Sequence, residues 1–342
     1  MLRVGFARWR SHLPSGGNRY DAELIRGMGE HGVELHEHAV EGPWPLPRKQ
    51  DRRRLAQLLG AEERWLMGNI VASAVPELIV SATGAGQHIT VLMHYFPADD
   101  PALLTVDRQW VESREAEAVA AASRIVVPSE WAAREVARRY GRDDAVVARP
   151  GVDPAPLAST SAGTPQLLWL GRLTATKDPL TLIDALARIT DLDWRIRLVG
   201  PAIPGDDADA LARARVVEHG LEDRVTLTGE LTGDALESAW AGSDLLVHTS
   251  RAETYGMVVS EALARGIPSI VVDGTGAAEA QAGVGAQFPP GDAAALADQL
   301  RGWLTDDALR HRWRADAEAA RTTIPTWQDM VGAVASAFTD GS

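Results

Sequence analysis

Short runs rich in valine, isoleucine and leucine alternate with helical stretches of about 10–16 residues along most of this chain of 342 residues. Parallel strands are joined by crossovers of about a dozen residues or more, usually helices, so the alternation predicts parallel sheets covered by helices. In the first half we expect strands at Leu2–Ala7, Val33–Val40, Leu78–Val80, Ile89–Met93, Arg124–Val127 and Ala145–Ala148. Helices are expected at Tyr20–Glu30 and from the N-cap Ser129 to Arg139, with a Gly-containing loop at Ser11–Gly17.

Residues 153–165 (DPAPLASTSAGTP) interrupt the alternation with a composition typical of linkers. The alternation then resumes, and we expect strands at Gln166–Leu170, Arg195–Val199, Arg224–Leu227, Asp244–His248 and Ser269–Val272. Helices are expected at Pro179–Ile189, Asp207–His219, Asp234–Ala241 and Gly256–Ala264, followed by two more. The sequence therefore predicts an α/β protein with two doubly wound, Rossmann-like domains, 1–155 and 156–324, facing an interdomain cleft.

Composition excludes several classes of function. The chain contains no cysteine, which excludes disulfides, cysteine-ligated zinc, iron–sulfur clusters and thiol catalysis. The formal net charge of the chain is −13, and residues 156–342 contribute −11 of it. This excess of acidic residues argues against nucleic acid as a partner. Arg3, Arg8 and Arg10 interrupt the N-terminal apolar run, and no later apolar run approaches about 18 residues, so we expect a cytoplasmic protein without a signal peptide. The first strand is not followed by G-x-G-x-x-G, which argues against an NAD-dependent dehydrogenase.

The most informative segment is SRAETYGMVVSEALARGIPSIV, residues 250–271. An apolar strand ends in a loop with Glu253, and a helix that starts near Gly256 carries Glu261. The free N–H groups of Gly256, Met257 and Val258 would lie between the two carboxylates, at the positive end of the helix, where they could hold a diphosphate. Carboxylates are good acceptors for paired sugar or ribose hydroxyls. The alternative is that both glutamates are solvated surface acids and Gly256 marks only an element boundary.

A second segment, LWLGRLTATKDPLTLI at residues 168–183, places Arg172 and Lys177 on the loop after a strand. Lys177 is conspicuous because Lys49 is the only other lysine among 34 basic residues. Two cations at the carboxyl end of a strand suit a diphosphate leaving group. As ordinary solvated charges beside Asp178, they would have no such role.

Two further candidates carry weaker signals. Gly16 and Gly17 stand between the first strand and the first helix, where paired glycines let the backbone approach a ligand. His94 stands at the end of the strand-like run ITVLMHYF and is a candidate for contacting a transferred sugar or an acceptor. A plain turn and a structural histidine are the respective alternatives.

Together, these segments resemble the retaining glycosyltransferases of the GT-B fold, specifically the large family 4 also described as glycosyl transferases group 1. The resemblance covers nearly the whole chain and is carried by SRAETYGMVVSEALARGIPSIVV, GRLTATKDPLTLIDAL, VPSEWAAREV, PGVDP, LVGPA and VTLTGEL. Residues 325–342, which include TWQDMVGAVASAF, resemble the last helix of this fold, which crosses back to the N-terminal domain.

The resemblance implies roles for the same residues. Glu261 would bind the ribose hydroxyls of a nucleotide sugar, and Glu253 would lie near the hydroxyls of the transferred sugar. Arg172 and Lys177 would neutralise the diphosphate, and the N–H groups of Gly256, Met257 and Val258 would complete the cradle. Gly16 and Gly17 would line the junction between donor and acceptor, and His94 would approach the sugar.

The reaction implied is the transfer of a hexosyl group from a UDP- or GDP-sugar to an unidentified acceptor with retention of configuration. It needs no metal and no cofactor besides the donor. The pairs Asp191/Asp193 and Asp207/Asp209 are similar to a metal-binding D-x-D, but we interpret them as turn or cap acids. Another nucleotide-sugar enzyme, of epimerase or phosphorylase type, and a noncatalytic sugar-binding protein are the alternative functions.

The basic run RKQDRRR at residues 48–54 allows two interpretations. We favour a solvated helix with an exposed charged face, because charge runs of this kind are usually solvated. The alternative is a patch that touches an anionic membrane surface.

Overall fold

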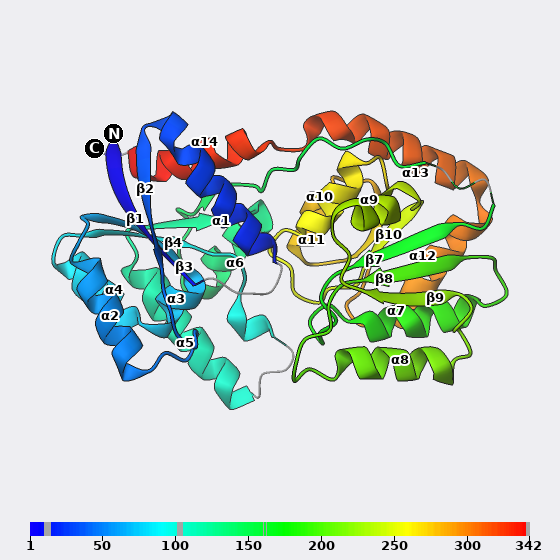
Figure 1. Cartoon of the computed structure of the whole chain (residues 1–342), viewed down its shortest axis with the longest axis horizontal. Coiled ribbons are helices and arrows are strands. Elements are labelled where there is room, and N and C mark those ends of the chain that lie inside the picture. Colours follow the sequence, from blue (N-terminus) through cyan, green and yellow to red (C-terminus); the bar gives the residue numbers. More distant parts are fainter. Residues whose placement is uncertain (10–14, 101–104, 160, 162, 340–342) are drawn as a thin grey trace. The chain divides into compact units, whose positions relative to one another are not determined.

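The computed structural model describes residues 1–9, 15–100, 105–159, 161 and 163–339 (Figure 1). The chain divides into two compact units. The first comprises Met1–Gly151 together with Pro325–Ser342, and the second comprises Val152–Ile324. Each unit is built around its own six-stranded sheet, in which all strand pairs are parallel.

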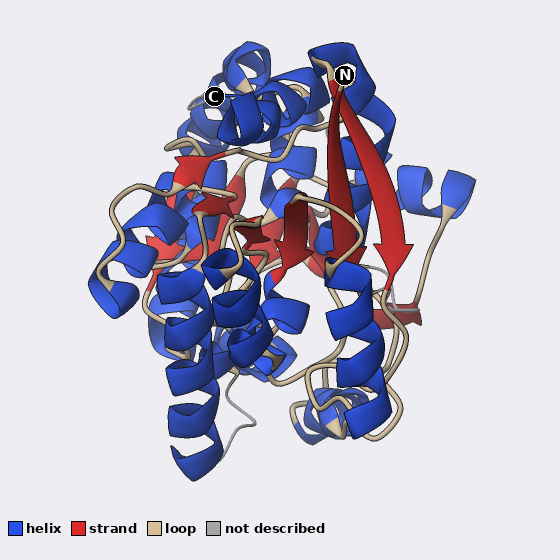
Figure 2. Ribbon diagram, turned by 90° about the vertical axis from the view of Figure 1, so that its left-hand side faces the viewer, coloured by secondary structure: helices blue, strands red, loops and turns tan. Residues whose placement is uncertain are grey.

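The sheet of the first unit has the order β2-β1-β3-β4-β5-β6. Its strands are β1 (Leu2–Arg8), β2 (Val33–Ala39), β3 (Arg64–Gly68), β4 (His88–Leu92), β5 (Arg124–Val127) and β6 (Val146–Val147). Its helices are α1 (Gly16–Gly27), α2 (Lys49–Leu59), α3 (Asn69–Ala74), α4 (Pro76–Gly84), α5 (Thr105–Ala121), α6 (Glu130–Tyr140) and α14 (Trp327–Thr339). Helices cover both faces of this sheet, as parallel strands buried on two sides require (Figure 2).

The last helix, α14, belongs to the first unit although it follows the second unit in sequence. Val331 lies against Gly27 of α1, where a Cβ would come within 2.9 Å of a Val331 methyl group. Met330 and Val334 are fully buried in the same cluster as Phe6 of β1. Figure 1 shows α14, in red, beside α1. Burial of these apolar residues of α14 stabilises the packing of the last helix on the first unit.

One predicted strand is wrong. Leu78–Val80 lies inside α4, and the third strand of the sheet is Arg64–Gly68, for which no strand was predicted. Pro76 stands at the start of α4 and Glu77 in its first turn, both of which favour a helix N-terminus. A short apolar run does not by itself distinguish a strand from a buried helix.

The expected loop before the first helix is also corrected. Gly16 and Gly17 form the first turn of α1, and the side chain of Ser15 accepts a hydrogen bond from Asn18 N as the N-cap. The remainder of that loop, residues 11–14, lies outside the described residues. The glycines therefore stand at a helix N-terminus rather than in a free loop.

The sheet of the second unit has the order β12-β11-β10-β7-β8-β9. Its strands are β7 (Gln166–Leu170), β8 (Arg195–Val199), β9 (Val225–Gly229), β10 (Leu245–His248), β11 (Ser269–Val272) and β12 (Gly285–Phe288), the last of which was not predicted. Its helices are α7 (Pro179–Leu186), α8 (Ala208–Glu218), α9 (Gly233–Ala241), α10 (Met257–Ala264), α11 (Gly276–Ala280), α12 (Ala293–Thr305) and α13 (Asp307–Ala320). Trp169, Trp194 and Trp303 are almost fully buried in its main core.

The two units meet in sequence at residues 151 and 152, whereas the predicted domain boundary lies after residue 155. The difference has a physical cause. Ala155 accepts a hydrogen bond from Arg321 through its carbonyl (2.6 Å), and Ala158 donates one to the Arg265 carbonyl (2.9 Å). These contacts attach the start of the predicted linker to the second unit.

The basic run forms part of α2, with Asp51, Leu55 and Leu59 buried and Lys49, Arg53 and Arg54 exposed. In the described part of the chain, no helix has both the length and the apolar character needed to span a membrane.

Candidate active site at the carboxyl ends of the strands

The order of the second sheet contains a topological switch point between β7 and β10. From β7 the chain moves outward through β8 to β9, and from β10 it moves the other way through β11 to β12. In open parallel sheets, ligands bind beyond the carboxyl ends of the strands at such a point. We therefore expect a ligand-binding site of this unit in the loops that follow β7 and β10.

These two loops are joined by hydrogen bonds. Thr249 donates through its hydroxyl to the Lys177 carbonyl (2.8 Å), and Arg251 donates through its backbone N–H to the Thr176 carbonyl (2.9 Å). The Arg251 guanidinium also binds the Asp178 carboxylate at 2.6 Å. Asp178 has φ 49° and caps α7 by accepting from a backbone N–H of its first turn. The loop carrying Lys177 is therefore held in one conformation by the neighbouring loop.

Lys177 and Glu253 form an ion pair through Glu253 Oε1. His248, at the end of β10, brings Nε2 to 3.2 Å from the same oxygen, in a polar contact that is not a well-aligned hydrogen bond. Burial raises the pKa of Glu253, but the charge of Lys177 and the His248 contact outweigh burial and hold that pKa well below its usual range. Glu253 is therefore a carboxylate at neutral pH, an acceptor of hydrogen bonds rather than an acid.

The N-terminus of α10 faces the same strand ends. Gly256 is its N-cap residue with φ 89°, a left-handed conformation that favours glycine, and no side chain among the described residues caps it. A Cβ on Gly256 would come within 3.2 Å of Ala277. Met257 and Val258 form the first turn of α10, so their N–H groups have no intrahelical acceptor. This end of α10 has the geometry of an anion site.

Glu261 lies on α10, half-buried, four residues after Met257 and therefore on the same face of the helix. Arg172 follows β7 by two residues and is also half-buried. The predicted residues of this unit, Arg172, Lys177, Glu253, Gly256, Met257, Val258 and Glu261, thus all belong to the two segments that follow β7 and β10.

In the first unit, His94 follows β4 and is tied to α1. Its Nε2 lies 2.8 Å from Asp21 Oδ1, and its ring lies 5.2 Å from the Tyr20 ring in an edge arrangement. A Cβ on Gly17 would come within 3.4 Å of the His94 ring, so the absence of a side chain at Gly17 leaves room beside the imidazole. Gly16 is exposed at the first position of α1. His94, Gly16 and Gly17 are therefore brought together at the carboxyl end of this sheet.

Two charged residues near His94, Asp21 and Arg8, were not predicted to lie here. Arg8 ends β1 and is 9% exposed, and it binds Asp21 at 3.3 Å and Glu37 at 2.9 Å. A signal was present, because Asp21 stands between the apolar residues Tyr20 and Leu24 on the buried face of α1. A charged residue on the apolar face of a helix needs a partner, and here the partners are Arg8 and His94.

The acidic pairs considered as a D-x-D lie in turns and at a helix start. Asp191 pairs with Arg301 at 2.7 Å, and Asp193 accepts from Thr164 at 2.7 Å. Asp207 is the N-cap residue of α8, and Asp209 follows in its first turn.

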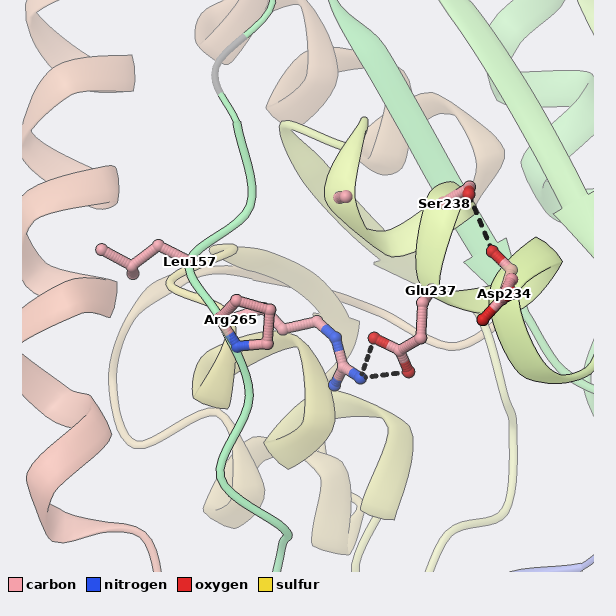
Figure 3. A pocket seen from close by; sticks show the side chains of 7 residues that line it. Leu157, Asp234, Glu237, Ser238 and Arg265 are labelled. Atoms are coloured by element: carbon pink, nitrogen blue, oxygen red, sulfur yellow. Dashed lines mark hydrogen bonds and ion pairs between the residues drawn. The ribbon is translucent and has the colours of Figure 1, made fainter.

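A surface cavity of about 360 Å³ lies elsewhere in the second unit, and Figure 3 shows it. Glu237 of α9 pairs across it with Arg265, which follows the last residue of α10, at 2.8 and 3.0 Å. Pro156 and Leu157 contribute apolar surface to its lining. The cavity lies at the end of α10 opposite Gly256, and none of the candidate site residues lines it.

Comparison with known proteins supports one family. Residues 159–320 match the model of the family described as glycosyl transferases group 1. A D-inositol 3-phosphate glycosyltransferase of Streptomyces avermitilis is 29% identical over 248 residues, which cover 66% of this chain and 53% of that protein. The chain spans about half the length of the curated relatives that it matches.

Two solved structures have the same architecture. Sucrose-phosphate synthase from Thermosynechococcus elongatus has a TM-score of 0.81 at 18% identity, over 99% of each chain. Anabaena HepE in complex with UDP and glucose has a TM-score of 0.77 at 19% identity, over 99% of this chain and 100% of that chain. The predicted pair of Rossmann-like domains is confirmed. Residues 159–320 therefore match the glycosyl transferases group 1 family, and the chain has the GT-B fold.

Proposed function

We propose that the protein is a retaining glycosyltransferase that moves a hexosyl group from a nucleotide diphosphate sugar to a hydroxyl-bearing acceptor. The observation that carries the proposal is the Lys177–Glu253 ion pair at the switch point of the second sheet, beside the start of α10, which no side chain of the described residues caps. Cationic and anionic groups held together there suit a nucleotide sugar, because the cation can bind its diphosphate and the carboxylate can accept hydrogen bonds from its sugar hydroxyls.

The diphosphate would be held by the Lys177 ammonium, the Arg172 guanidinium and the N–H groups at the start of α10. These groups stabilise negative charge, which grows on the diphosphate as the bond from the anomeric carbon to the phosphate oxygen breaks. The acceptor oxygen forms the new bond on the same face of the sugar, and its proton passes to the departing phosphate. These cationic and N–H groups therefore act on the leaving group, and no metal is required in this scheme.

The sugar and the ribose would be bound by carboxylates. Glu253 uses Oε1 for Lys177, which leaves Oε2 to accept from a sugar hydroxyl. Glu261 would accept from the ribose hydroxyls of the nucleotide. Because its pKa is held low, Glu253 stays ionised, so it suits recognition of hydroxyl groups rather than proton donation. We assign His94 to contact with the transferred sugar or the acceptor.

A nucleotide-binding experiment tests this proposal. We expect one of UDP, GDP or their sugars to raise the melting temperature of the protein, because a ligand that binds only the folded state stabilises it. UDP is the first choice, since HepE was solved with UDP and glucose. The absence of a shift with every nucleotide would contradict the donor site.

Product analysis separates the alternative functions. With a donor and a panel of polyols, a transferase forms a new glycoside and free nucleotide diphosphate. An epimerase converts the donor into an isomer, a phosphorylase requires inorganic phosphate, and a sugar-binding protein forms no product. Retention is read from the anomeric configuration of the new glycoside.

A further inference from the structure

A buried polar cluster lies beneath the segment that carries His94. Asn69, the first residue of α3, is 1% exposed and reaches across to the chain as it leaves β4. Its Oδ1 accepts from His94 N at 3.2 Å, and its Nδ2 donates to the Tyr95 carbonyl at 2.7 Å. One carboxamide thus binds two consecutive residues of the main chain.

Glu115 of α5, which is fully buried, supports the carboxamide from the other side. Asn69 Nδ2 donates to Glu115 Oε1 at 3.0 Å, and the Ser73 hydroxyl donates to the same oxygen at 3.4 Å. The Tyr140 hydroxyl donates to Oε2 at 2.7 Å. Burial raises the pKa of Glu115 to about 7, although these hydrogen bonds oppose the rise.

These contacts leave the Asn69 carboxamide only one orientation. Oδ1 faces a donor, the N–H of His94, and Nδ2 faces two acceptors, the Tyr95 carbonyl and Glu115 Oε1. Turning the amide over would place oxygen against oxygen twice. Protonation of Glu115 is accommodated at Oε2, where the Tyr140 hydroxyl can rotate to accept.

A buried carboxyl group and a buried amide are costly to desolvate, and apolar side chains of similar volume would fill this space at lower cost. The contacts that reach the main chain are those at His94 and Tyr95. The cluster therefore defines where the His94 backbone lies, while Asp21 binds the ring.

We propose that Asn69, supported by Glu115, is a positioning residue that sets the His94 main chain for the reaction. The inference rests on the proposed function, in which His94 contacts the transferred sugar or the acceptor. Asn69 does not itself touch the reacting atoms and acts through the backbone. Loss of the Asn69 carboxamide should lower turnover without lowering the affinity for the nucleotide. The residues proposed to bind the nucleotide all belong to the second unit.

The test compares N69D with Q57E, an exposed amide-to-acid change on α2. In N69D, an oxygen replaces Nδ2 and faces the Tyr95 carbonyl and Glu115, so the His94 segment must move. We expect donor hydrolysis or transfer to fall roughly tenfold to hundredfold, as a displacement of about 1 Å would cause. Nucleotide affinity should stay within about twofold of wild type. The His94 amide resonance should shift in N69D and stay unchanged in Q57E and E115Q, because glutamine keeps an acceptor for Asn69.

Wild-type turnover in N69D would overturn the proposal, and so would a parallel loss of nucleotide affinity. If N69D does not fold, N69A replaces it, and hydrogen exchange in wild type supplies a second test. Slow exchange of the His94 amide supports its bond to Asn69, and exchange at the rate of an exposed loop refutes it. If wild type neither binds nor cleaves any donor, the proposed function fails, while the amide data still decide whether Asn69 holds His94.

Discussion

Lys177 and Glu253, which lie 76 residues apart in sequence, share an ion pair at the carboxyl ends of β7 and β10. The pairing follows from topology, because β7 and β10 are hydrogen-bonded neighbours although three α-helices, a short 3-10 helix and two strands separate them along the chain. The loop after each strand contributes one charge. The sheet therefore assembles a dipolar site from two distant segments.

Removal of Lys177 should abolish most activity and also reduce stability. The Glu253 side chain is 15% exposed, and in K177M its carboxylate has no cationic partner. We therefore expect a lower melting temperature, because an ion without its partner is left partly buried. We also expect a loss of turnover of about a hundredfold or more. The double variant K177M/E253Q should recover stability, with a coupling of about 1–3 kcal/mol in urea unfolding, while turnover stays low.

R195M, which removes an exposed cation at the amino end of β8, is the control for charge alone. Full turnover in K177M would refute the assignment of Lys177 to the diphosphate. If the changes in unfolding free energy of K177M and E253Q add up to that of the double variant, the ion pair contributes nothing to stability.

Glu261 should determine nucleotide affinity. E261A removes the acceptor proposed for the ribose hydroxyls, so nucleotide dissociation constants should rise about tenfold or more, which is typical for loss of a hydrogen bond to a charged group. Isothermal titration with UDP and GDP measures the effect. E222Q, an exposed change in the same unit, should bind as wild type does. Equal affinity of E261A and E222Q for the nucleotide would exclude Glu261 from the site.

Gly256 should not accept a side chain. Its φ of 89° and the 3.2 Å approach of a Cβ to Ala277 predict that G256A loses about 1–3 kcal/mol of stability and most nucleotide binding. G205A is the matched control, since Gly205 has φ 84° but, among the described residues other than its chain neighbours, no atom lies within 4 Å of its Cβ position. Similar losses in both variants would mean that backbone strain alone, and not crowding at α10, explains the effect.

Glu115 should make stability depend on pH between about 4.5 and 7. Its ordinary pKa is 4.5 and its folded pKa is about 7, so in this window the folded state holds a proton that the unfolded state has released. Stability therefore falls as pH rises through the window, by an amount on the order of 3 kcal/mol, and levels off above pH 7. Asn69 and Ser73 from α3 and Tyr140 and Arg139 from α6 face the carboxyl group.

Urea unfolding of wild type and E115Q from pH 5 to 8 measures this contribution as the difference between the two curves. The glutamine does not titrate, so the unfolding free energy of wild type should fall relative to that of E115Q as pH rises. A constant gap would mean that Glu115 titrates at the same pH in the folded and unfolded states.

Local patterns in the sequence were sufficient for most elements. The strands Arg124–Val127 and Gln166–Leu170 and the helix capped by Ser129 agree with the structure because their signals, an apolar run or a capping hydroxyl, lie within a few residues. The runs at Leu78–Val80 and Arg64–Gly68 carry similar local signals. Which of them becomes a strand was decided by packing, because Arg64–Gly68 pairs with both β1 and β4.

The sequence by itself determined the class of fold, the strand-end loops and the charged residues on them, because alternation and loop placement are local properties of the chain. Only the tertiary structure decided which of these residues meet. Asp21 reaches His94 across 73 residues and Asn69 reaches Glu115 across 46. A buried polar side chain is stable only beside a partner, and the partner is chosen by strand order, which no local pattern contains.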